Sequence, residues 1–233
     1  MSGLAGEAFV AIWHDLAPAG RAQFYEWHQR EHMPERVGIP GFRRGRRYIR
    51  VEGALQEWFN LYEVDTLEVL VGQDYLGRLN APTPWTKETV AHFRNVTRGL
   101  ARVRASIGHG QGGVIGTWRF DVVPGRADEL ERHLARAVLP EIAGRARVLG
   151  AHLGVTDAAG SGIETAERKA RGNPTDVPGW IVLVEAADDA AIRDATAEIL
   201  VADPLARAGV VGAVRSAIYR LETTRLKTAW TAG

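Results

Sequence analysis

The chain contains no cysteine, so disulfides, thiolate metal ligands and cysteine nucleophiles are all excluded. It also lacks an excess of either charge, because 29 basic and 28 acidic residues leave a formal net charge of +1, and we expect no nucleic-acid partner. Residues 1–15 include the acidic Glu7 and only a short apolar run, which is typical of neither a signal peptide nor a membrane span. The sequence therefore predicts a cytoplasmic protein that binds no membrane.

An internal repeat is present. The 233 residues suit either one large domain or two of about 100 residues each, and the repeat favours two. At offsets of 105, then 122, then 111, the sequence aligns Trp13 with Trp118, His28 with His133, Trp58 with Trp180, and 103–107 with 214–218.

Each copy predicts the element order β-α-β-β-α-β, which is that of a ferredoxin-like α+β unit. Helices cover one face of the sheet in such a unit, and the other face stays bare. We expect two tandem units, at 1–110 and 111–225, to pack their bare faces against each other as a pseudo-dimeric α/β barrel, followed by a tail at 226–233.

The changes of offset predict where the copies differ. The polar segment 157–178, rich in glycine and proline, is expected to be a long loop inserted in the second copy. The segment 84–95 is expected to be a helix added to the first copy.

The stretch WHQREHMP at 27–34 combines several ionisable residues. His28 and His32 stand four residues apart and so share a helix face, with Glu31 beside them. The spacing is that of H-x-x-E-H zinc peptidases, but such an enzyme needs a different fold, so we expect no metal site. A structural role stays open, with His28 at the edge of the core and His32 at the helix C-terminus.

The alignment separates residues that both copies share from residues that only the first copy has. His28 has a histidine counterpart, whereas Glu31 and His32 do not, so this pair is the better functional candidate. His14, at the end of the first strand, and Tyr48 also lack counterparts.

The strand expected over 42–51 contains five arginines. With a period of two, Arg44 and Tyr48 share one face and Arg47 lies on the other. A guanidinium that points toward the helices matches a carboxylate or phenolate with paired donors. The alternative is an edge strand that its charges protect from aggregation. We expect one or two of the arginines to line a site.

The run WHQREHMPERVGIPGFRRGRRY at 27–48 resembles the dimeric α/β-barrel superfamily, in particular EthD-like proteins and their relatives among polyketide cyclases and antibiotic-biosynthesis monooxygenases. The resemblance implies a ligand between the helices and the sheet of one unit. It also implies that His32 is a polar pocket residue, with Trp27, His28 and Tyr48 nearby, and that the second copy is a scaffold.

The resemblance further implies a cofactor-independent enzyme that acts by proton transfer on a small or aromatic carbonyl metabolite, as an isomerase, cyclase, lyase or cofactor-free oxygenase. We expect His32 to be the general base or acid, oriented by Glu31 or His28, and the substrate to be anionic or aromatic. The expected substrate contacts are Trp13, His14, Trp27, Arg44, Arg47 and Tyr48. Two alternatives stay open, a non-catalytic ligand-binding or stress-associated module and a haem protein of the same fold, and a homodimer is not excluded.

Overall fold

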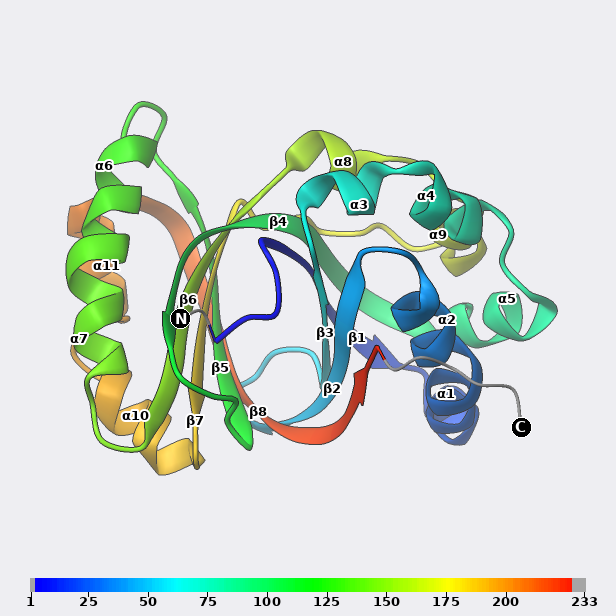
Figure 1. Ribbon diagram of the computed structural model, residues 1–233, viewed down its shortest axis with the longest axis horizontal. Coiled ribbons are helices and arrows are strands. Elements are labelled where there is room, and N and C mark those ends of the chain that lie inside the picture. Colours follow the sequence, from blue (N-terminus) through cyan, green and yellow to red (C-terminus); the bar gives the residue numbers. More distant parts are fainter. Residues whose placement is uncertain (1–2, 228–233) are drawn as a thin grey trace.

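The computed structural model describes residues 3–227 and contains a closed antiparallel barrel with helices outside it (Figure 1). Around the barrel the strands follow the order β1-β3-β2-β8-β5-β7-β6-β4. Their bounds are β1 Ala8–Leu16, β2 Phe42–Glu52, β3 Trp58–Val64, β4 Phe93–Gly108, β5 Val114–Val122, β6 Val148–Thr156, β7 Trp180–Ala186 and β8 Val210–Leu226.

The helices form two groups on opposite sides of the barrel (Figure 1). One group contains a 3-10 turn at Pro18–Gly20, α1 Arg21–Trp27, α2 Met33–Gly38, α3 Leu67–Val71, α4 Gln73–Asn80, α5 Pro84–Val90, α8 Ala158–Gly162 and α9 Ala166–Arg171. The other contains α6 Ala127–His133, α7 Leu139–Ala143, α10 Asp189–Thr196 and α11 Ala202–Ala208. A π-helical turn joins α1 to α2 at His28–His32, and another joins α6 to α7 at Leu134–Val138. Within residues 3–227, no helix has the length and apolar character needed to cross a bilayer.

Strands β4 and β8 join the two units. The order β4-β1-β3-β2 is that of one ferredoxin-like sheet, and β8-β5-β7-β6 is that of the other. In addition β4 pairs with β6, and β8 pairs with β2, so neither sheet keeps an open edge. The predicted fold, two tandem ferredoxin-like units in a pseudo-dimeric α/β barrel, is confirmed.

The barrel interior is filled by side chains from alternate strand positions. Trp13 stacks on Phe59 with ring centroids 4.9 Å apart. Arg46 lies between two buried carboxylates, 2.9 Å from Glu63 and 2.8 Å from Glu185. This ion pair network lies inside the barrel and is separated by the sheet from the helices.

The ladder register corrects the alignment of the two copies. Ala8 of β1 pairs with Arg102, and Val114 of β5 pairs with Arg220. The first strands therefore correspond at an offset of 106, not 105, and helices α1 and α6 also begin 106 residues apart. The closing strands β4 and β8 correspond at 118, not 111. Because side chains alternate between faces, an alignment that is wrong by one residue exchanges the interior and exterior of the barrel.

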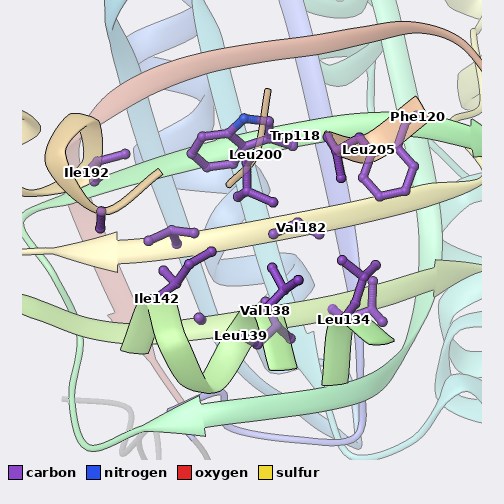
Figure 2. Packing of buried hydrophobic residues seen from close by; sticks show 14 of the residues in the cluster. Trp118, Phe120, Leu134, Val138, Leu139, Ile142, Val182, Ile192, Leu200 and Leu205 are labelled. Carbon is purple, nitrogen blue, oxygen red and sulfur yellow. The ribbon is translucent and has the colours of Figure 1, made fainter. Parts of the chain in front are cut away.

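The corrected register gives His28 a new counterpart. His28 corresponds to Leu134, which is buried among the apolar side chains of the second unit (Figure 2). His133, the counterpart predicted from the sequence, is exposed. Trp118 packs in the same apolar cluster, outside the barrel, whereas Trp13 lies inside it. The second unit therefore has no histidine that corresponds to His28.

The segment 84–95 contains a helix, α5, as predicted, but this helix is not an addition. Its counterpart α11 lies 118 residues further along, at the offset of the closing strands. The first copy differs instead in having α3 and α4 where the second copy has α10.

The inserted segment 157–178 is not a plain loop, because it contains α8 and α9. The side chains of Asp157 and Thr165 cap the two helices. Although it belongs to the second half of the sequence, the segment lies over the first unit (Figure 1), where α9 contacts α4 and α5. Helices of this length leave no period that the sequence could reveal.

The predicted tail begins too early. Strand β8 continues to Leu226, which pairs with Arg44, and the Lys227 ammonium donates to the carbonyl oxygen of Ile39 at 2.7 Å. The remainder of that tail, 228–233, lies outside the described residues.

Candidate functional site

The helix layer of the first unit is polar where that of the second unit is apolar. Its buried side chains include His14, His28, His32, Asn60 and Tyr62. At offsets of 106 and 122, their counterparts are Phe120, Leu134, Val138, Val182 and Val184, all members of one apolar cluster (Figure 2). Burying polar groups is unfavourable unless they are paired, and the second unit folds without them. The polar set is therefore not a requirement of the fold.

Arg47 fixes the tautomer of His28. A guanidinium nitrogen of Arg47 lies 3.3 Å from Nδ1 of His28, and because arginine only donates, Nδ1 accepts. Burial lowers the pKa of His28 well below its usual value, so the ring is neutral and its proton is on Nε2. Nε2 lies 3.1 Å from the hydroxyl oxygen of Tyr62, which therefore accepts. The hydroxyl proton of Tyr62 remains free to be donated to another group.

His32 is held by ring contacts. Its ring centroid lies 4.2 Å from that of Trp27 and 5.6 Å from that of His28. Trp27 is itself fixed by its indole N–H, which donates to Thr86 at 3.0 Å. Nδ1 of His32 is buried and has no hydrogen-bond partner among the described residues. Burial, and next the charge of Arg36, lower the pKa of His32 well below its usual value, so the ring is neutral and can accept a proton.

His14 positions the amide of Asn60. Nε2 of His14 lies 3.1 Å from the amide nitrogen of Asn60, and Nδ1 lies 3.4 Å from the carbonyl oxygen of Asp15. Burial lowers the pKa of His14 to about 3, so this ring is neutral as well. The amide oxygen of Asn60 is buried and unpartnered within residues 3–227.

Two small cavities flank His32. Their volumes are about 30 Å³ and about 20 Å³, and both are lined by Ile12, His32, Tyr62, Glu167 and Arg171. Spaces of this size hold one or two water molecules rather than a metabolite. Glu167 and Arg171 lie on α9, so the inserted segment of the second half forms one wall of the site.

The sheet divides the predicted site residues into two sets. His14, Trp27, His28, His32 and Arg47 lie in the helix layer of the first unit. Trp13, Arg44 and Tyr48 face the barrel interior, where Arg44 pairs with Glu63 at 2.5 Å and Tyr48 stacks near Phe59. These three residues do not line the cavities at His32, so a ligand bound there would not contact them as predicted.

Glu31 does not orient His32. Its carboxylate accepts hydrogen bonds from the hydroxyls of Thr83 at 2.6 Å and Thr86 at 3.0 Å, at the start of α5. Glu31 therefore attaches α5 to the π-helical turn, and its predicted role in orienting His32 is not supported by a contact between the two side chains.

Three residues of the site were missed in the sequence. Asn60 and Tyr62 alternate with the interior residues of β3, and this period of two places them on the face of Trp58, toward the helices. Arg171 gives no such signal, because its place depends on where the inserted segment packs.

The predicted alternative was haem held by a histidine, which needs that histidine beside a large cavity. The cavities at His32 are far too small, and a larger groove of about 350 Å³ beside Trp118 is lined by no histidine. As folded here, the residues do not fit haem. Among residues 3–227 there is also no group of three or more histidine or acidic side chains that could hold a metal ion.

No protein-family model and no curated protein matches the sequence. Solved structures nevertheless share the fold over nearly the whole chain. An anthrone oxidase-like protein has a TM-score of 0.60 at 15% identity, over 97% of this chain and 95% of that one. A Fusobacterium nucleatum protein provisionally named a monooxygenase has a TM-score of 0.58 at 9% identity, over 96% of both chains. A mutant chlorite dismutase from Candidatus Nitrospira defluvii has a TM-score of 0.51 at 8% identity, over 94% of this chain and 92% of that one. The likeness shows the dimeric α/β-barrel fold, which was predicted.

Proposed function

We propose that the chain is a cofactor-independent enzyme that removes a proton from a small aromatic or carbonyl-activated carbon acid. His32 is the base, and the helix layer of the first unit is the active site. The observation that carries the proposal is that His32 is neutral, lines both cavities and has a buried, unpartnered Nδ1, whereas its counterpart in the second unit is Val138.

Tyr62 stabilises the enolate that the proton transfer creates. Burial raises the pKa of Tyr62, so its hydroxyl stays protonated. The N–H of His28 already donates to the hydroxyl oxygen, and the Tyr62 proton is available for the substrate oxygen. Tyr48, which was an expected substrate contact, faces the barrel interior and cannot share this role.

The names of two structural neighbours, a monooxygenase and an anthrone oxidase-like protein, support an oxygen-dependent reaction. An anthrone-type CH₂ group gives one proton to His32, and O₂ oxidises the resulting enolate. The carbon becomes a carbonyl, one oxygen atom of O₂ enters the product, and the other leaves as water with the two hydrogens. The substrate itself is the reductant, and the first step is the same for an isomerase or cyclase.

Oxygen uptake with anthrone as the probe tests the proposal. We expect His32→Ala to lower turnover by about 100-fold or more, because a positioned general base contributes about that factor. Val138→Ala, at the matching position of the second unit, also removes buried side-chain atoms, although fewer, and is expected to leave turnover unchanged. Undiminished turnover in His32→Ala would show that His32 is not the base.

A non-catalytic ligand-binding module is the second candidate, and the lowered pKa of His32 favours it, because such a ring is a weak base. It predicts that anthrone or a related aromatic carbonyl compound raises the melting temperature of the protein without any oxygen uptake or product.

A further inference from the structure

Apolar and aromatic residues make up most of the lining of the larger cavity beside His32, but the charged residues among them are mostly positive. Four of its lining residues are arginines and one is a carboxylate, namely Arg36, Arg98, Arg168, Arg171 and Glu167. We infer that this cavity is a subsite for a carboxylate group of the substrate, with Arg171 as its principal ligand. The role of this subsite in turnover rests on the proposed function, but carboxylate binding does not.

Three of the four guanidinium groups already have partners. Arg36 is buried and pairs with Glu35 and with Glu167 of α9. Arg98 donates to the hydroxyl of Tyr75 at 3.1 Å. Arg168 donates to the carbonyl oxygens of Ser161 and Gly162, at 3.3 and 3.2 Å. Arg168 also pairs with Glu164 at 3.7 Å, so Arg36 and Arg168 have carboxylate partners, whereas Arg98 donates to a neutral hydroxyl.

Arg171 is the exception. Its side chain makes no hydrogen bond or ion pair with any residue in 3–227, and its Nε is buried. Burial lowers the pKa of Arg171 to about 10, an effect that Glu167 opposes and that Arg98 and Arg168 reinforce. The group is therefore still charged at neutral pH, and although the residue is only half-buried, its Nε is buried without a hydrogen-bond partner among the described residues, which is unfavourable. An anion in the cavity would remove this unfavourable state.

The guanidinium favours a carboxylate among small anions. A carboxylate is flat and accepts two parallel hydrogen bonds from a guanidinium, and a space of about 30 Å³ has room for only a small group of this kind. Phe42, Tyr62 and Tyr75 also line this space, and they provide apolar contact for the part of the ligand that carries the carboxylate.

The subsite is coupled to the proposed base. After burial, the charges of Arg36 and Arg171 and the rings of His28 and His14 lower the pKa of His32. Arg36 already pairs with two carboxylates, so a carboxylate bound at Arg171 would offset the charge that is still unpaired and would make His32 a stronger base. Substrate binding would thereby prepare the proton transfer.

Titrations of the full chain at constant ionic strength test the subsite. The probes are acetate and benzoate, with acetamide and benzamide as neutral controls of the same shape, and binding is followed by melting temperature and by calorimetry. We expect the carboxylates to bind at least about tenfold more tightly than the amides, and R171Q to remove that preference, because the charge-assisted pair is lost. R171K keeps the charge and is expected to keep part of the preference. R132Q, at an exposed arginine on α6, is the matched control and should change nothing.

The inference is overturned if amides bind as tightly as carboxylates, if no carboxylate binds, or if a folded R171Q variant keeps the wild-type preference. H32A separates this outcome from the proposed function. If H32A retains turnover while benzoate binding still depends on Arg171, the base is wrong and the subsite stands. If H32A loses turnover while R171Q binds benzoate normally, the base stands and the subsite is wrong.

Discussion

Arg47 donates to Nδ1 of His28 at 3.3 Å and pairs at the same time with Glu222 at 2.9 Å. Glu222 lies on β8, the strand that the second unit contributes to this side of the barrel. A contact between the two halves of the chain therefore sets the tautomer of His28. That tautomer in turn leaves the hydroxyl proton of Tyr62 available for another acceptor.

Arg47→Met is expected to lower kcat by about tenfold with a smaller change in KM. Without Arg47 the tautomer of His28 is no longer fixed, so the Tyr62 hydroxyl no longer always donates its proton to the substrate. Arg47→Lys retains a donor and should restore part of the loss. The nitrogen chemical shifts of His28 provide the direct readout, since the wild-type ring should carry its proton on Nε2 and the Met variant should show a mixture. Arg43→Met, at an exposed position of the same strand, is the control. Identical nitrogen spectra for Arg47→Met and wild type would contradict the assignment.

Tyr62→Phe removes the proposed donor to the enolate. We expect kcat to fall by about 100-fold, the usual effect of losing one such donor, with substrate affinity nearly unchanged. Tyr48→Phe is a matched control, because the Tyr48 hydroxyl is buried in the barrel interior without a hydrogen-bond partner. Equal losses in the two variants would indicate a general effect on the structure rather than a role in the reaction.

The protein should lose stability in mild acid. His14, His28 and His32 have folded-state pKa values below their usual value of about 6.5, mainly because they are buried, and that of His14 is about 3. The unfolded chain therefore takes up protons first, so the stabilisation is complete above about pH 6.5 and falls toward pH 3, by up to about 1.4 kcal/mol per pH unit for each histidine.

Urea unfolding between pH 7.5 and 4.5 measures this slope. His14→Phe, which installs the residue found at the matching position of the second unit, should make the slope shallower. His133→Ala, at an exposed histidine, should not. A slope that His14→Phe leaves unchanged would mean that His14 is not buried as described.

Arg46→Met should destabilise the barrel without touching the site. The substitution leaves the buried carboxylate of Glu185 without its guanidinium partner, and breaking such a buried pair costs about 3–5 kcal/mol. The free energy of unfolding in urea checks the expectation. Adding Glu185→Gln to Arg46→Met should recover part of the loss, and no recovery would show that the unpaired charge is not the cause.

The order of strands and helices was predictable because each element has its own period and each boundary its own turn residues. The register between the copies was not. A tryptophan and a histidine matched by coincidence at an offset of 105, and this match set the predicted alignment. The alternation of faces along β1 argues against it, because it places Val10, Ile12 and His14 on the side opposite the interior residues. Applying that alternation to both copies would have exposed the mistake.

The site was predictable only in part. His28 and His32 stand out because histidines are few and because their spacing places them on one helix face. Trp13, Arg44 and Tyr48 were grouped with them by nearness in sequence, although the sheet lies between. Arg171 belongs to the site through a packing contact between distant parts of the chain, and no local pattern reports such a contact.

The position of the segment 157–178 over the first unit makes each cavity at His32 depend on both halves of the chain. Glu167 and Arg171 of α9 belong to the second half of the sequence, yet they line both cavities of the first unit. A substitution in α9 therefore changes the surroundings of His32 from more than 130 residues away, and the first half alone would lack one wall of these cavities.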